Sequence, residues 1–200
     1  MSFSLLLSFI FLITSFSFYV QWPGLYGPNG LLPIHEGNAC STAARSAMTL
    51  TCFHDDFGIS LDGLVEILLF SLVTLSLFAT LAGTIVGRYL FSPVFALLWF
   101  GYSNIVTIGD TFTSFQWDIL LMETAFLSIF AASNNAWLSH LNYCYRFLAF
   151  KLMFLSGIVK LQAQCPTWEN LTALEFHFAT QCIPTPLAWF AHQMPPFLLR

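Results

Sequence analysis

The chain has 200 residues, of which 57% are hydrophobic and only 8% are charged, and its formal net charge is −4. A soluble globular domain carries about a quarter charged residues, so this chain has too few charges to cover the surface of a soluble protein. The lack of a basic cluster also argues against binding to nucleic acid. The composition therefore indicates an integral membrane protein.

Long, continuous apolar runs predict an all-α, polytopic helical membrane bundle rather than a β-barrel. Five runs approach the roughly 20 residues that a helix needs to cross a bilayer. They cover about 3–20, 63–86, 89–108, 117–133 and 144–162, and a further helix begins at about 184. We expect residues 1–200 to form a single membrane domain.

The first run is either a cleaved signal peptide or a retained helix. It has no basic stretch before it and no clear cleavage site of small residues, which favours a retained helix. Arg88 falls between the second and third runs and Arg146 at the start of the fifth, and basic residues prefer the cytoplasmic side. This orientation places the N-terminus in the cytoplasm and the loops 21–62, 109–116 and 163–183 on the lumenal or outer side. The N-x-T sequon at Asn170 agrees with it and marks a glycosylation candidate.

Four cysteines, Cys40, Cys52, Cys165 and Cys182, fall in the loops assigned to that side. An oxidising compartment would allow them to form disulfides, with three possible pairings. Cys40–Cys52 and Cys165–Cys182 are the local choices. The alternative is that these residues remain thiols.

Three separated blocks carry a family resemblance. They read YVQWPGLYGPNGLLP (19–33), FQWDILLMETAFL (115–127) and a longer block over 146–195 that contains W-x-x-L-T-A-L, F-H-F-x-T-Q and P-x-P-x-A-W-F-x-H-Q. Together they resemble the lipase maturation factor family of endoplasmic-reticulum membrane proteins. Family members continue into further helices and a large lumenal region, so residues 1–200 match the N-terminal part of a longer architecture.

The resemblance implies a multi-pass protein of the endoplasmic-reticulum membrane. If the source were bacterial, the same topology would lie in the plasma membrane, and another source would place it in another organelle membrane. The implied role is that of a non-enzymatic, chaperone-like factor that helps secreted lipases fold and assemble. The implied client partners are lipases, and membrane lipids are expected partners of any such bundle. We expect no cofactor and no metal, and the charge pattern excludes nucleic acid as a partner. The absence of a G-x-S-x-G motif gives no support to a lipase activity of its own.

Two other functions remain open at this stage. The segment FLSGIVKL (154–161) is distantly similar to the membrane domain of vitamin K-dependent gamma-carboxylase, and Lys160 occupies the position of a functional lysine there. A membrane enzyme using Lys160 as a base is therefore one alternative. The other is an accessory subunit of a larger membrane complex, which would partner other membrane subunits.

Asp118 and Glu123 lie within the fourth run and raise the question of how a membrane helix holds two acids. Five helical residues separate them by about 140° and about 7.5 Å, so a dyad that shares a proton is not expected. Asp118 falls at the lumenal mouth, where a carboxylate suits the first helical turn. Glu123 is deeper and needs a proton or a partner.

Lys160 is the partner that we expect for Glu123, because the fifth run is antiparallel and places it at similar depth. Alternatively, Lys160 extends to the aqueous surface and Glu123 bonds to polar side chains of other helices. The full candidate polar cluster comprises Glu123, Lys160, Asp118, His177, Gln181 and His192.

Trp168, Leu171, Leu174 and Phe178 recur at three- and four-residue spacing. This apolar stripe predicts an amphipathic helix over about 168–180 at the membrane interface. The histidines lack the spacing of a metal site. His54, Asp55 and Asp56 are consecutive polar residues, which alone give weak support for a metal.

Overall fold

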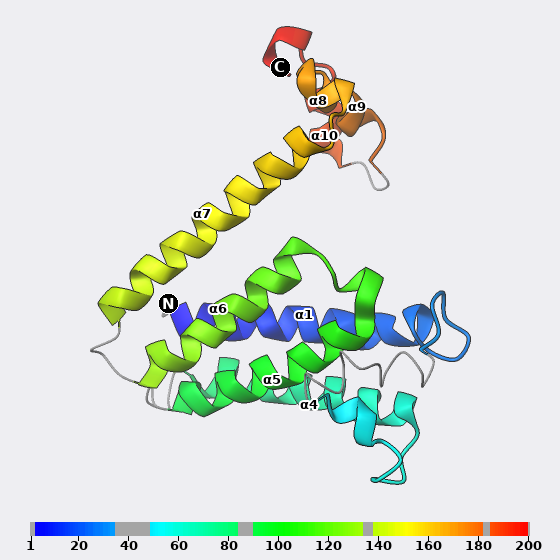
Figure 1. The fold of residues 1–200 in the computed structure, drawn as a ribbon, viewed down its shortest axis with the longest axis vertical. Helices are drawn as coiled ribbons and strands as arrows, with labels where there is room; N and C mark the ends of the chain where they lie inside the picture. Colours follow the sequence, from blue (N-terminus) through cyan, green and yellow to red (C-terminus); the bar gives the residue numbers. More distant parts are fainter. Residues whose placement is uncertain (1–2, 35–48, 84–89, 134–137, 182–184, 200) are drawn as a thin grey trace. The chain divides into compact units, whose positions relative to one another are not determined.

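The computed structural model describes residues 3–34, 49–83, 90–133, 138–181 and 185–199 (Figure 1). Every regular element within these ranges is helical, so the prediction of an all-α membrane bundle is confirmed. The chain forms two compact units, Met1–Leu148 and Ala149–Arg200. The expectation of one domain over the whole length stays a prediction.

Long helices make up the first unit, and each of them overlaps one of the predicted apolar runs. They are α1 (Phe3–Leu25), α4 (Leu61–Ala82), α5 (Phe91–Gly109), α6 (Gln116–Ser133) and the first part of α7 (Leu138–Gln162). Two short 3₁₀ helices, η1 (Leu50–Phe53) and η3 (Asp110–Phe112), precede α4 and α6.

Three helices in the described part of the chain are long and apolar enough to cross a membrane, namely α1, α4 and α5. Helices α6 and α7 form where the fourth and fifth spans were predicted, but they are not among the helices that are long and apolar enough to cross a membrane. They carry several charged side chains, which lower their apolar character. The predicted total of five spans is therefore not confirmed.

Helix α4 shows how local sequence sets a helix start. Ser60 is its N-cap, and its side-chain Oγ accepts a hydrogen bond from the Gly63 N–H at 3.2 Å. Asp62 lies in the first turn, where the helix dipole favours a negative charge. These two residues explain why the helix begins at Leu61, two residues before the predicted start.

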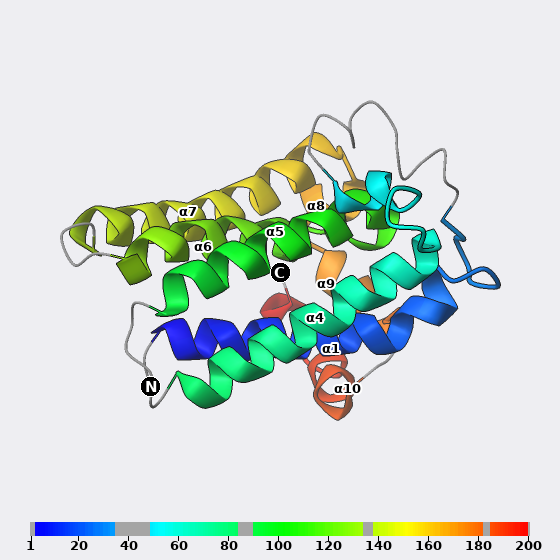
Figure 2. The ribbon, with the colours of Figure 1, turned by 90° about the horizontal axis from the view of Figure 1, so that it is seen from below.

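The helices that follow one another in the first unit also pack together: α1 on α4, α4 on α5 and α5 on α6 (Figures 1 and 2). Phe11, Val65 and Phe95 are fully buried in their shared core. Gly101 allows α4 and α5 to approach closely, because a Cβ atom there would lie 2.7 Å from Leu72 Cδ2. Small residues at such crossings are typical of membrane helix packing.

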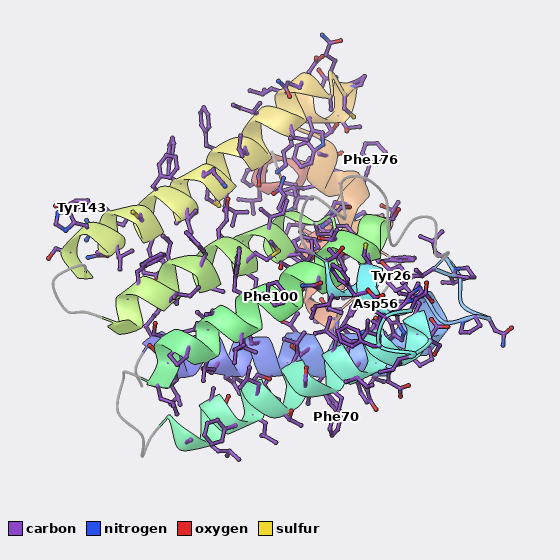
Figure 3. All side chains as sticks on the ribbon, turned by 60° about the horizontal axis from the view of Figure 1, so that its bottom comes forward. Tyr26, Asp56, Phe70, Phe100, Tyr143 and Phe176 are labelled. Atoms are coloured by element: carbon purple, nitrogen blue, oxygen red, sulfur yellow. The ribbon has the colours of Figure 1, made fainter. Side chains whose placement is uncertain are left out.

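One end of this unit gathers the segments that follow α1 and α5. The Tyr26 hydroxyl donates a hydrogen bond to the Gly109 carbonyl oxygen. The Leu50 N–H donates to Asn104 Oδ1 at 2.6 Å, which holds η1 against α5. We call this the loop end, and Figure 3 shows Tyr26 there.

The second unit contains the rest of α7, then α8 (Pro166–Glu169), α9 (Ala173–Ala179), α10 (Pro186–His192) and the 3₁₀ helix η5 (Pro196–Leu198). Helix α10 corresponds to the further helix expected from about 184. The Thr185 hydroxyl caps it by accepting from the Ala188 N–H at 3.2 Å.

The amphipathic helix expected over about 168–180 differs in the structure, because it is divided into α8 and α9. Leu171 adopts a left-handed conformation with φ of 58°. The Thr172 N–H donates to the Thr167 carbonyl at 2.8 Å, and the Leu171 N–H donates to the Trp168 carbonyl at 3.3 Å. These two bonds form a Schellman motif, which ends α8 after one turn.

Candidate functional site

Asp118 lies in the first turn of α6 and is nearly buried, with 9% of its surface exposed. The Tyr102 hydroxyl on α5 donates a hydrogen bond to Asp118 Oδ1 at 2.6 Å. The Tyr102 ring packs edge-on against Phe11 of α1, with 5.9 Å between centroids. The contact with Phe11 holds the Tyr102 side chain in place. The Tyr102–Asp118 hydrogen bond therefore links α5 to α6 within the core.

The sequence predicts Asp118 at the start of a helix but does not indicate Tyr102 as its partner. The tyrosine itself indicates that a partner exists, because a phenol hydroxyl buried in an apolar helix needs a hydrogen-bond partner. Which residue supplies that partner depends on how α5 and α6 pack.

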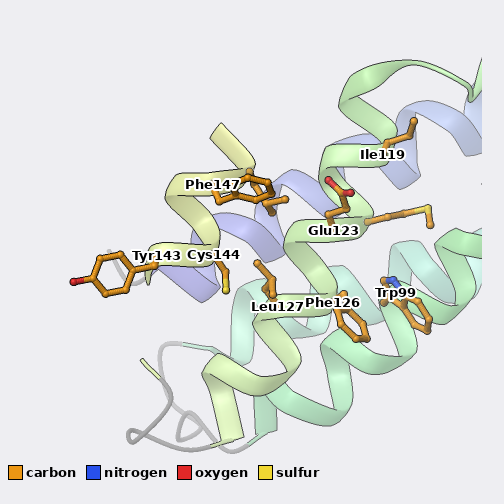
Figure 4. A pocket seen from close by; sticks show the side chains of 10 residues that line it. Trp99, Ile119, Glu123, Phe126, Leu127, Tyr143, Cys144 and Phe147 are labelled. Carbon is orange, nitrogen blue, oxygen red and sulfur yellow. The ribbon is translucent and has the colours of Figure 1, made fainter. Parts of the chain in front are cut away.

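Glu123 has different surroundings from Asp118, as the five-residue spacing predicts. It lines a pocket of about 780 Å³ formed by α5, α6 and the first turns of α7. Figure 4 shows Glu123 and Leu127 projecting from α6 on the side of Phe147 and Cys144. Trp99 and Phe126 also line the pocket, so its surface is almost entirely apolar around one carboxyl group.

A second polar pair joins α6 to the start of α7. Ser128 Oγ and the Tyr145 hydroxyl lie 2.9 Å apart, and Ser128 is buried. Ser128 Oγ also donates to the Thr124 carbonyl at 2.7 Å. Ser128 and Tyr145 were not predicted from the sequence, because serine and tyrosine alone carry no recognisable motif.

Lys160 belongs to the second unit, and its Nζ lies 4.3 Å from the centroid of the Trp168 ring. This geometry is that of a cation–π contact. Glu123 belongs to the first unit, so the proposed Glu123–Lys160 pair stays a prediction.

The remaining residues of the predicted polar cluster lie in the second unit. His177 Nε2 and Gln181 Nε2 lie at hydrogen-bond distance, 3.1 Å apart, one turn from each other. His192 is in the last turn of α10 and is exposed. His177 and Gln181 therefore form a pair, and His192 lies apart from them on α10.

Among the glycosylation and disulfide candidates, the described residues are Asn170, Cys52 and Cys165. Asn170 is exposed at the end of α8. The partners assigned to Cys52 and Cys165, namely Cys40 and Cys182, lie outside the described residues, so both disulfides stay predictions.

No three His, Cys, Asp or Glu side chains in the described ranges gather as a metal site. His54 Nδ1 lies 3.0 Å from Asp55 Oδ1 instead.

An all-α bundle with three such apolar helices and polar pairs between helices defines a helical membrane protein. Residues 1–200 match the family model described as the lipase maturation factor transmembrane domain. The chain belongs to the lipase maturation factor family, which confirms the resemblance found in the sequence.

Curated relatives agree with the family assignment. The chain is 41% identical over 204 residues to lipase maturation factor 2 of Xenopus tropicalis, covering 94% of this chain and 28% of that protein. It is 40% identical over 209 residues to lipase maturation factor 2 of Xenopus laevis, covering 97% and 29%. It is 38% identical over 194 residues to lipase maturation factor 2 of Gallus gallus, covering 90% and 27%. The chain thus spans less than a third of each of these relatives, and no solved structure matches it significantly.

Proposed function

We propose that this chain forms the N-terminal membrane portion of a factor that assists the folding and assembly of secreted lipases. The match of residues 1–200 to the lipase maturation factor transmembrane domain carries this proposal. In this role the bundle anchors and orients the segments that receive the client. The factor acts without catalysis and contacts membrane lipids, client lipases and other membrane subunits.

The proposed location is the endoplasmic-reticulum membrane, with the N-terminus in the cytoplasm and the loop end in the lumen. The hydrogen bonds of Tyr26 and Asn104 support a defined loop end, because they tie the segments after α1 to α5. A lumenal client would then meet a surface that is fixed to the bundle.

A catalytic role for Lys160 receives less support than the maturation role. A lysine that acts as a base must be neutral, which usually requires desolvation or a nearby cation. The Lys160 Nζ instead lies over the Trp168 ring, 4.3 Å from the ring centroid.

The proposed role is tested by lipase secretion in cells that lack the endogenous factor. The full-length protein is expected to restore secretion of active lipase, while secretion of an unrelated glycoprotein stays unchanged. If the well-expressed full-length protein restores neither the amount nor the activity of secreted lipase, the maturation role is wrong.

The proposed orientation is tested at Asn170, which belongs to the only N-x-S/T sequon in the sequence. The protein is expected to lose mobility on a gel through one glycan, and endoglycosidase H should reverse that change. The N170Q and T172A variants should both run as the deglycosylated form. Protease protection of a tag at the N-terminus in sealed microsomes would contradict the proposed orientation.

A further inference from the structure

A groove of about 340 Å³ lies between α1 and α4 at the loop end. Tyr19, Trp22 and Pro23 line its α1 side, and Asp62 and Glu66 line its α4 side. Ligand pockets usually measure about 300–1,000 Å³. The groove is therefore large enough for a small polar headgroup and too small for a whole amphiphile.

The two acids give the groove a specific charge. Asp62 and Glu66 are four residues apart, so they lie on one face of α4 about one turn from each other. Like charges at this spacing repel. The helix dipole offsets the cost for Asp62 in the first turn, and it helps Glu66 less because the effect fades beyond that turn.

Neither acid has a partner among the residues that the structure describes. No described side chain makes an ion pair or a hydrogen bond with the Asp62 or Glu66 carboxylate. Asp62 is half-buried and Glu66 is exposed, so both remain accessible from the groove. A cation placed between them would remove the repulsion.

Aromatic side chains form the opposite wall and are held by packing. Trp22 is 4% exposed and stacks on Tyr26, with 4.9 Å between ring centroids. Tyr19 is half-buried, and its ring centroid lies 6.4 Å from that of Phe70. Acids facing aromatic rings suit a quaternary ammonium group, because the rings attract the cation and its methyl groups bury apolar surface.

The groove continues into an exposed apolar surface along the same two helices. Phe70 follows Glu66 by four residues, so it lies on the same face of α4, and it is 58% exposed (Figure 3). On α1, Val20 lines the groove and is 61% exposed, and Phe16 four residues earlier is 56% exposed. Both helices are long and apolar enough to cross a membrane, so this surface suits contact with acyl chains.

The geometry points to a binding site for a membrane phospholipid with a choline headgroup. The trimethylammonium group sits between the two carboxylates and the Tyr19–Trp22 wall, and the acyl chains lie along Phe70 and Phe16. The position of the groove at the ends of two apolar helices favours a lipid over a basic peptide from solution. This inference does not depend on the proposed role in lipase maturation.

The test uses the full-length protein in nanodiscs that contain spin-labelled phosphatidylcholine or spin-labelled phosphatidylglycerol. The fraction of motionally restricted label measures association with the protein. The native protein should prefer the choline lipid over the anionic one. Replacing Glu66 by Gln should lower that preference about two- to fivefold.

A matched control removes one acid outside the groove. Asp56 is exposed at the same end and does not line the groove, so D56N should leave the lipid preference unchanged. The Y19L variant keeps an apolar wall and should also weaken the preference, which separates the aromatic contribution from charge. Thermal unfolding of each variant confirms that it remains folded.

Three results would overturn the proposal. The first is that the native protein shows no preference for the choline lipid. The second is that D56N weakens the preference as much as E66Q does. The third is that E66Q abolishes binding of a tetralysine peptide while the lipid preference stays unchanged, which would identify the groove as a site for a basic protein segment.

Discussion

Replacing Tyr102 by Phe removes one hydroxyl and leaves the ring that packs against Phe11. The lost hydrogen bond joins two nearly buried groups, since Tyr102 is 3% and Asp118 is 9% exposed. Its length of 2.6 Å is typical of a bond to a charged acceptor. Bonds to charged groups contribute about 1.5–3 kcal/mol in proteins, and bonds between membrane helices average about 0.6 and reach about 1.7 kcal/mol.

These ranges predict that Y102F lowers the free energy of unfolding by about 1–2 kcal/mol. The assay is reversible unfolding in mixed micelles of a mild detergent and dodecyl sulfate, followed by far-ultraviolet circular dichroism. Y143F is the matched control, because Tyr143 is 72% exposed and its hydroxyl makes no hydrogen bond within the described ranges. It should change stability by less than about 0.5 kcal/mol.

A double-mutant cycle with Y102F and D118A isolates the interaction between the two side chains. The cycle cancels the separate loss of a favourable charge at the start of α6. A coupling energy within the usual error of additivity, about 0.3–0.5 kcal/mol, would refute the reasoning. So would a Y102F variant that is as stable as Y143F.

Two further predictions concern the turn after α1 and the thiol after α7. G27A should destabilise the protein by about 1–3 kcal/mol, because the added Cβ would lie 2.6 Å from the Pro23 carbonyl oxygen. G24A is the control in the same unfolding assay, because a Cβ at Gly24 would meet open space. Equal destabilisation by the two variants would contradict this explanation. The pKa of the Cys165 thiol lies below its ordinary value, because the Thr167 hydroxyl donates a hydrogen bond to the thiolate. The hydroxyl oxygen lies 3.0 Å from the sulfur, and the Thr167 backbone N–H donates a second hydrogen bond. In the reduced protein, T167V should therefore shift the pH profile of iodoacetamide alkylation to higher pH, and superimposable profiles would remove Thr167 as the cause.

The positions of the long helices could be predicted from the sequence because their signal is local. An apolar run of membrane length has few alternatives to a helix, since every backbone polar group must be paired within the segment. The predicted ends shift by a few residues where caps decide, as Ser60 does for α4. The break between α8 and α9 escaped prediction, because the left-handed Leu171 is not a residue that usually marks such a turn.

The candidate site could be predicted only in part. Helix periodicity predicted different positions for Asp118 and Glu123, and the two acids have different surroundings in the structure. Periodicity could not supply Tyr102 for Asp118. The hydrogen bond that Asn104 accepts from the Leu50 N–H was likewise hidden, because the two residues are far apart in sequence.

The sequence by itself determined the class of this protein, the positions of its long helices and its family, because composition, run length and motifs are properties of the linear chain. The tertiary structure decided which polar groups meet. Tyr102 donates to Asp118, Glu123 lines an apolar pocket, and Asp62 and Glu66 line a groove together with aromatic residues of α1. These outcomes depend on the crossing and rotation of packed helices, which are set by side chains from several helices at once.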